Sequence, residues 1–221
     1  MVILQSKKNV FWEALIITVA IFILGVFLGI AYEANRADDI NRFVYGSEVN
    51  LMDIFIMNNL IDLGTVDCHK MVNVNLEFAD KIFEEAKQVD ILEASGRITE
   101  QTRLAHRRYD LFRTFLWINT IKILDKCPEE NISSVIYLYE LETDDLAQKA
   151  NQNVWSKILT DLKEQKGSGI VLIPIAADAN FTSLDSLIDK FEIKSYPVVI
   201  VNEEHVISRL TSVEDLEKYR L

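Results

Sequence analysis

Residues 135–175 read VIYLYELETDDLAQKANQNVWSKILTDLKEQKGSGIVLIPI, and this stretch decides the fold of the C-terminal half of the chain. Its two ends are apolar and rich in β-branched residues, as is typical of buried strands. Between these ends, residues 146–165 carry apolar side chains three and four positions apart, which is the period of an amphipathic helix. A strand, a helix and a second strand in this order predict a parallel βαβ unit.

Pro174 and the residues that follow it extend this unit. Proline has no N–H to donate to a neighbouring strand, so the strand at 170–175 is expected at an edge of the sheet. Residues 202–204 fit a three-residue hairpin turn. The elements predicted beyond Pro174 are a helix at 184–191, antiparallel strands at 198–201 and 205–210, and a helix at 213–219. Residues 131–221 are therefore predicted as one βαβαββα domain.

Tyr196 and Pro197 stand directly before the third predicted strand. This position, together with the order of the elements, resembles the thioredoxin superfamily over residues 131–221. The resemblance implies that the peptide bond before the proline is cis, which costs only about 0.5–1 kcal/mol at an X-Pro bond. It also implies that this loop faces the start of the first helix of the domain. In that superfamily the backbone of the residue at the position of Tyr196 pairs with an extended substrate.

The cysteine pair that performs the redox chemistry of the superfamily is missing from this chain. A Cys-x-x-Cys motif is expected at the start of the first helix of the domain, but Leu146 and Lys149 stand at the two positions. We therefore predict no catalytic residue and no cofactor. Leu146 and Lys149, together with Tyr196 and Pro197, are interpreted as a surface that binds a protein partner.

The N-terminal part of the chain contains a membrane-spanning pattern. Residues 14–32 carry no charge, and at about 1.5 Å per residue they form enough helix to cross a hydrocarbon core of about 30 Å. A cleaved signal peptide is the alternative, but this apolar run is longer than the apolar region of such peptides. The segments predicted here are a cytoplasmic tail at 1–10, a transmembrane helix at 11–33 and a stalk at 34–46.

Two features of this segment bear on topology and assembly. Lys7 and Lys8 precede the span, and the positive-inside tendency then puts the N-terminus in the cytoplasm and the C-terminal domains outside the cell membrane. Gly25 and Gly29 form a G-x-x-x-G motif, a spacing that lets two helix backbones approach closely. A monomeric anchor with chance spacing and a homodimer through this seam are both compatible with the motif. The anchored arrangement resembles membrane-anchored thioredoxin-like proteins of prokaryotes, including archaea.

Residues 47–130 are predicted as a helical hairpin domain. Residues 48–63 are apolar at helical spacing but carry too many charges for a second span, which predicts a buried helix. Two longer helical patterns follow at 67–93 and 99–126, and Ser95-Gly96 separates them. Because the connection is short, the two long helices are expected to run antiparallel. The predicted fold class is thus mixed α+β and α/β.

Cys68 and Cys127 are the two cysteines of the chain, and both fall at the open end of this hairpin. A disulfide between them would close a loop of about 60 residues, which stabilises a fold by about 4 kcal/mol through the loss of chain entropy in the unfolded state. Such a bridge persists in oxidising compartments. Two buried thiols are one alternative. A redox pair that serves a thiol-disulfide oxidoreductase or a chaperone-like folding assistant is another.

Composition and scattered motifs limit the remaining functions. The chain has 34 Asp and Glu against 23 Lys and Arg, which argues against nucleic acid as a partner because phosphate contacts need basic surfaces. Asn131 and Asn180 begin glycosylation sequons, which are meaningful only outside the cytoplasm.

Histidines and arginines give no further site. His69, His106 and His205 lack the spacing of metal ligands and are interpreted as solvated or capping residues, so no metal site is predicted. The arginines at positions 103, 107 and 108 are interpreted as a charged, solvated helix face, with a docking site as the alternative. The sequence as a whole predicts a single-pass membrane protein whose redox-inactive thioredoxin-like domain binds or scaffolds an extracytoplasmic protein.

Overall fold

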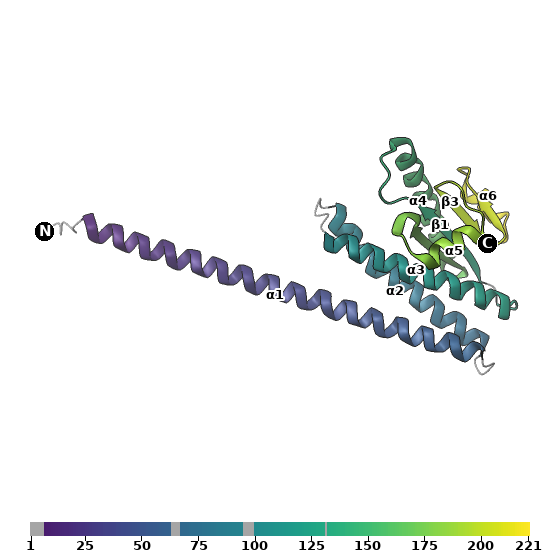
Figure 1. The fold of residues 1–221 in the computed structure, drawn as a ribbon, viewed down its shortest axis with the longest axis horizontal. Helices are drawn as coiled ribbons and strands as arrows, with labels where there is room; N and C mark the ends of the chain where they lie inside the picture. Colours follow the sequence, from purple (N-terminus) through teal and green to yellow (C-terminus); the bar gives the residue numbers. More distant parts are fainter. Residues whose placement is uncertain (1–6, 63–66, 95–99, 131) are drawn as a thin grey trace. The chain divides into compact units, whose positions relative to one another are not determined.

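The computed structural model describes residues 7–62, 67–94, 100–130 and 132–221. The predicted break at Ser95-Gly96 and the sequon residue Asn131 lie outside these residues. The chain divides into two compact units, Met1–Met52 and Asp53–Leu221. The elements in chain order are α1 (Lys7–Asp62), α2 (Cys68–Ala94), α3 (Glu100–Lys126), β1 (Ser133–Tyr139), α4 (Leu146–Lys166), η1 (Gly167–Gly169), β2 (Ile170–Ala176), η2 (Ala177–Ala179), α5 (Thr182–Lys190), β3 (Val198–Val201), β4 (His205–Ile207) and α6 (Val213–Glu217) (Figure 1).

The N-terminal helix α1 contains the predicted span. Its segment Val10–Tyr32 has a mean hydropathy of 2.9, and none of it is buried in the structure. This segment carries one charged residue, Glu13, near its N-terminal end. A helix of this length satisfies its own backbone hydrogen bonds and exposes apolar side chains, which is what a bilayer requires of a spanning segment. The prediction of an N-terminal apolar helix long enough to serve as a membrane anchor is confirmed.

The second half of α1 corrects the prediction of a separate, buried helix at residues 48–63. The structure continues one helix from Lys7 to Asp62, so the predicted stalk at 34–46 is helical as well. No proline lies between residues 34 and 62. The one glycine in that range, Gly46, destabilises a helix by only about 1 kcal/mol. The side chains of Val49, Met52 and Ile56 are exposed and do not form a core.

The predicted helical hairpin is formed by α2 and α3, which pack against each other along their lengths. A disulfide joins Cys68, the first residue of α2, to Cys127, which directly follows α3, with 5.7 Å between the two Cα atoms. Because the start of one helix is bonded to the end of the other, the two helices run antiparallel. Both the antiparallel hairpin and the predicted disulfide are therefore confirmed.

The four strands form one mixed sheet in the order β2-β1-β3-β4. β1 pairs in parallel with β2, and the antiparallel partner on its other side is β3, which in turn pairs with β4. Pro174 lies in β2, opposite Tyr137 of β1, so the residue that cannot donate to a ladder is in an edge strand as predicted. The turn between β3 and β4 holds Asn202 and Glu203 at φ values of 49° and 60°.

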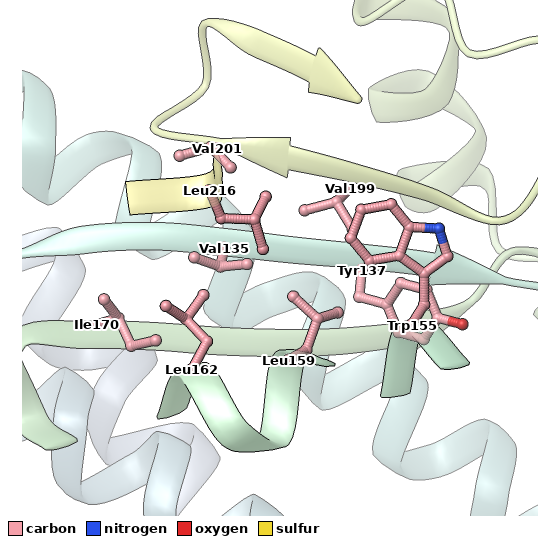
Figure 2. Packing of buried hydrophobic residues seen from close by; sticks show 9 residues of the cluster. All are labelled: Val135, Tyr137, Trp155, Leu159, Leu162, Ile170, Val199, Val201 and Leu216. Atoms are coloured by element: carbon pink, nitrogen blue, oxygen red, sulfur yellow. The ribbon is translucent and has the colours of Figure 1, made fainter. Parts of the chain in front are cut away.

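The core lies on both faces of this sheet. On one face α4 and α6 pack against the strands, and Figure 2 shows the buried cluster that results. Its members are Val135, Tyr137, Trp155, Leu159, Leu162, Ile170, Val199, Val201 and Leu216. The alternate residues of β1, Ile136 and Leu138, point to the opposite face and are also fully buried. The hairpin helix α3 packs against β2 and α5. The predicted domain junction at residues 130 and 131 thus lies inside one compact unit.

Trp117 of α3 fixes the hairpin to the turn between β3 and β4. Its indole Nε1 donates to Glu203 Oε2 at 2.9 Å, and its ring stacks on Phe191 with 5.3 Å between centroids. Ser134 Oγ donates to the other oxygen of Glu203 at 3.0 Å. Burial raises the pKa of the Glu203 carboxyl, while the hydrogen bonds from Trp117 and Ser134 act in the opposite direction. One side chain in the β3–β4 turn thus connects α3 with the start of β1.

Removal of the disulfide is expected to destabilise the protein. The double variant Cys68→Ser/Cys127→Ser should lose about 4 kcal/mol of unfolding free energy, because the unfolded chain regains the entropy of a loop of about 60 residues. Urea unfolding of the full chain in lipid nanodiscs measures this loss, with the fluorescence of the buried Trp117 and Trp155 as the signal. Wild-type protein treated with a reductant should unfold at the same urea concentration as the variant. Equal midpoints for the oxidised wild type and the variant would contradict the expected role of the bridge.

Candidate functional site

The candidate site lies where loops from three parts of the sheet gather. These loops follow β1 (residues 140–145), follow β2 (177–181) and precede β3 (195–197), and we call them the loop cluster. Asp178, after β2, accepts hydrogen bonds from the backbone N–H groups of Leu141 at 3.0 Å and Glu142 at 2.9 Å. Both carboxylate oxygens of one side chain thus hold the loop that leads from β1 to α4.

Tyr196 and Pro197 form the third member of the loop cluster. The peptide bond between them is cis, which agrees with the expectation drawn from the sequence. Pro197 is buried and Tyr196 is partly buried. Burial raises the pKa of the Tyr196 phenol, and the carboxylates of Glu140, Asp185 and Asp178 raise it further. The ring is therefore neutral at physiological pH and lies in an acidic environment.

The start of α4 is capped by a carboxylate. Asp145 Oδ1 accepts from the backbone N–H groups of Ala147 at 2.8 Å and Gln148 at 3.3 Å. These N–H groups, together with the helix dipole, are what would stabilise a thiolate at this helix start. Leu146 is 79% exposed here, and Lys149 lines a cavity between α4 and the helical hairpin. The helix terminus is thus satisfied by Asp145 and contains no nucleophile.

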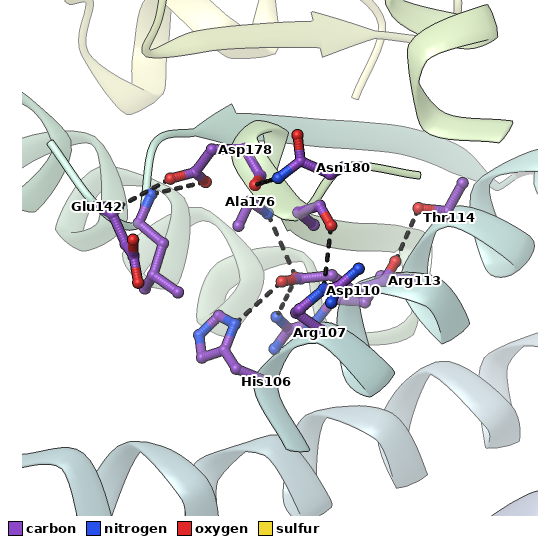
Figure 3. A network of polar contacts seen from close by, with 11 residues as sticks. His106, Arg107, Asp110, Arg113, Thr114, Glu142, Ala176, Asp178 and Asn180 are labelled. Carbon is purple, nitrogen blue, oxygen red and sulfur yellow. Dashed lines mark hydrogen bonds and ion pairs between the residues drawn. The ribbon is translucent and has the colours of Figure 1, made fainter. Parts of the chain in front are cut away.

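A buried polar network lies under the loop cluster, and sequence analysis missed it. Asp110 of α3 is 1% exposed, and its Oδ2 lies 3.0 Å from His106 Nδ1. Its Oδ1 accepts from Arg113 Nη1 at 3.2 Å and from the backbone N–H of Ala176 at 3.3 Å, at the end of β2 (Figure 3). Asp110, which is itself held by His106 and Arg113 of the same helix, therefore fixes α3 to the edge strand.

The interpretation of His106 as a solvated or capping residue was wrong, because its side chain is buried against Asp110. The spacing of His106, Asp110 and Arg113 places all three on one face of α3, and this was the available signal. His69 is exposed and lies 3.8 Å from the Glu130 carboxylate, and His205 is partly buried and lies 3.8 Å from the Glu204 carboxylate.

The arginines of α3 do not act as one solvated face. Arg107 Nε donates to the carbonyl oxygen of Ala179 at 3.2 Å (Figure 3). The Arg107 guanidinium lies 5.3 Å from the ring centroid of Phe181. Arg107 therefore fastens α3 to the segment between β2 and α5. Arg103 pairs with Glu142 at 3.4 Å, but both side chains are more than half exposed, so the pair adds little stability.

A cavity of about 590 Å³ opens between the hairpin, the edge of the sheet and α4. Its walls come from α2, α3, β1, β2 and α4, all within the unit Asp53–Leu221. Lys149, which the sequence assigned to the partner-binding surface, lines this cavity together with Glu140. The predicted set of four residues is thus divided, with Tyr196 and Pro197 in the loop cluster and Lys149 in the cavity wall.

The remaining predicted residues are positioned as follows. Asn180 is exposed at the end of η2, with its Nδ2 donating to Asp178 O at 3.0 Å, so the sequon is on the surface. A Cβ added to Gly25 or Gly29 would meet no atom within 4 Å, and the predicted seam is uncovered in this single chain. A homodimer through that seam stays a prediction. Cys127 is buried and Cys68 partly buried, and their bond leaves the chain without a thiol.

Comparison with models of known protein families gives no match, and comparison with curated proteins gives none either. One solved structure, a malarial protein, is similar over 41% of this chain and 94% of its own length, with 22% identity and a TM-score of 0.33. A similarity at this level carries no argument about function.

Substitution of the buried carboxylate under the loop cluster is expected to destabilise the protein. Asp110→Asn should cost about 3 kcal/mol of unfolding free energy, because it leaves the buried Arg113 guanidinium without its counter-charge. Asp125→Asn is a matched control, since Asp125 is exposed on the same helix and its loss should cost less than about 0.5 kcal/mol. Urea unfolding measures both variants. Equal effects of the two substitutions would show that the Asp110 network does not hold the hairpin.

Proposed function

We propose that the chain is a single-pass membrane protein that displays a redox-inactive thioredoxin-like domain outside the cell membrane and binds or scaffolds proteins there. The loop cluster and Leu146 form the proposed binding surface. The observation that carries the proposal is the carboxylate of Asp145 at the start of α4. Redox proteins of that superfamily have their cysteine pair at this helix start.

The thioredoxin-like assignment is supported by the arrangement of the strands. β2 lies at the edge beside β1, and the antiparallel hairpin of β3 and β4 follows the Tyr196–Pro197 loop. These are the features that the resemblance to the superfamily implies for residues 131–221. Tyr196 lies near the carboxylates of Glu140 and Asp178 in the other two loops of the cluster. The resemblance to the superfamily implies that the backbone of Tyr196 pairs with an extended chain segment.

The absence of redox chemistry is supported by the cysteine content. The sequence contains two cysteines, and these two form the disulfide at the base of the hairpin, in elements other than α4. At the start of α4, the N–H groups that would lower the pKa of a thiol are already bonded to Asp145.

The proposed location is supported by the apolar helix and the disulfide together. The segment Val10–Tyr32 suits an anchor, and Lys7 and Lys8 before it favour a cytoplasmic N-terminus. A structural disulfide in the following unit is expected in an oxidising compartment. With the C-terminal unit outside, the exposed sequon at Asn180 would be accessible to glycosylation in an organism that performs it.

The chemistry of the proposed surface favours a partner with basic and apolar groups. Glu140, Glu142 and Asp178 belong to the loop cluster, and Leu141 and Leu146 are exposed beside them. Acidic side chains around apolar contacts provide electrostatic complementarity for a basic partner segment and exclude acidic ones.

Site-specific photocross-linking in native membranes tests the proposal. A photoreactive phenylalanine at Leu146, which is 79% exposed, should yield an adduct of discrete mass. The same probe at Leu141 should capture the same protein, because Leu141 belongs to the loop cluster and Leu146 directly follows it. Val154 is the matched control, since it is exposed on α4 but distant in sequence from the helix start. If all three positions give the same adducts, or none gives a discrete one, the loop cluster is not a protein-binding surface.

A thiol-disulfide oxidoreductase or folding assistant that uses Cys68 and Cys127 is the second candidate. It is favoured by the position of Cys68, which is partly exposed at the first residue of α2, where a helix N-terminus stabilises a thiolate. Turnover in an insulin-reduction assay that Cys68→Ser abolishes would support this function over the proposed one.

A further inference from the structure

The cavity between the hairpin and α4 collects positive charge in an acidic protein. The chain has a net charge of −11, yet the cavity is lined by four cationic side chains and two carboxylates. The cations are Lys87 of α2, Arg113 of α3, and Lys149 and Lys163 of α4. The carboxylates are those of Asp80 and Glu140. This distribution is the reverse of the composition of the chain as a whole.

Three of the four cations have no carboxylate partner among the described residues. Arg113 is paired with Asp110, whereas none of the ion pairs within the described part of the chain includes Lys87, Lys149 or Lys163. Of the two carboxylates, Glu140 already accepts a hydrogen bond from Gln148 Nε2 at 2.8 Å. With Arg113 balanced by Asp110, three lysines and two carboxylates remain in the lining, so the cavity carries a net positive charge.

Lys163 is the most buried of these lysines. Its Nζ donates to the backbone carbonyls of Gly167 and Ile170, both at 2.8 Å, which fixes the position of the ammonium group and leaves one of its three N–H donors for a ligand. Burial lowers the pKa of Lys163, and the carboxylate of Asp80 acts in the opposite direction. An anion in the cavity would add to the counter-charge that Asp80 provides to Lys163.

The other part of the cavity wall is apolar and aromatic. The rings of Tyr137 and Tyr139 stack with 5.4 Å between centroids and an interplanar angle of 21°. Phe83 of α2 is 55% exposed, and Leu172 and Pro174 of the edge strand complete this side. Transfer of an apolar body from water to a concave surface lined by aromatic and aliphatic groups is favourable in free energy.

We propose that this cavity binds a small organic anion that combines an apolar or aromatic body with a carboxylate or phosphate group. Its volume lies within the range of about 300–1,000 Å³ that is usual for small-molecule sites. The anionic group is bound by Lys87, Lys149 and Lys163, and the body lies against Phe83 and Tyr139, because Tyr137 is buried beneath them. The cavity adjoins the loop cluster and shares Glu140 and Leu141 with it, but the lysines and aromatic groups that carry this proposal lie outside the cluster, and the proposal does not depend on the protein-binding function.

Isothermal titration calorimetry of the full chain in lipid nanodiscs tests this site, with empty nanodiscs as the blank. Phenyl phosphate and phenylacetate are the two probes, and their comparison distinguishes a phosphate from a carboxylate as the preferred anion. At least one of them should bind saturably with one site per chain. Inorganic phosphate, which lacks the body, and benzyl alcohol, which lacks the charge, should each bind more weakly than the better probe.

Lysine variants locate the binding. Lys87→Gln/Lys149→Gln should weaken binding of the better probe about tenfold, and both positions are exposed, so the fold should be retained. Lys157→Gln is the matched control, because Lys157 is exposed on α4 and does not line the cavity. Binding equal to wild type in the double variant, an equal loss in Lys157→Gln, or no saturable binding of either probe would overturn the proposal.

Discussion

The disulfide between Cys68 and Cys127 ties the first residue of α2 to the residue that follows α3, shortly before β1 begins at Ser133. It therefore closes the base of the hairpin at the point where the chain enters the sheet. The same bond uses both cysteines of the sequence, so neither is available at the start of α4. The carboxylate of Asp145 caps that helix start instead. Stability, the absence of a thiol and the proposed oxidising location all depend on this one covalent constraint.

Polar contacts, in addition to the disulfide, fix the position of α3 against the sheet. Trp117 binds the β3–β4 turn through Glu203, Asp110 binds the end of β2, and Arg107 binds the segment between β2 and α5. Apolar packing alone would allow α3 to slide along the sheet, whereas buried, directional hydrogen bonds fix its position. The loop cluster and the cavity are both framed by α3, so their geometry follows from this docking.

Much of the fold could be predicted because it follows from local periodicity. Pro174 indicated the edge strand, and the positions of Cys68 and Cys127 in the two long helices indicated the bridge. The continuous α1 was missed because a polar stretch of sequence has no marker that distinguishes a solvated helix from a stalk. His106 and Asp110 were missed for a different reason. Their burial depends on contact with Ala176, which is distant in sequence, and a single sequence does not reveal such a pairing. The cavity is likewise formed by elements separated in the chain.

The oxidation state of the two cysteines in the native protein tests the central claim most directly, namely that the bridge is structural and that the domain is redox-inactive and outside the membrane. Cells are quenched in acid, exposed thiols are alkylated, and the protein is analysed by mass spectrometry without reduction. The account predicts one population, with Cys68 linked to Cys127 and no alkylated thiol. Chains with two alkylated cysteines would contradict the proposed location, and mixed disulfides with other proteins would contradict the absence of redox activity.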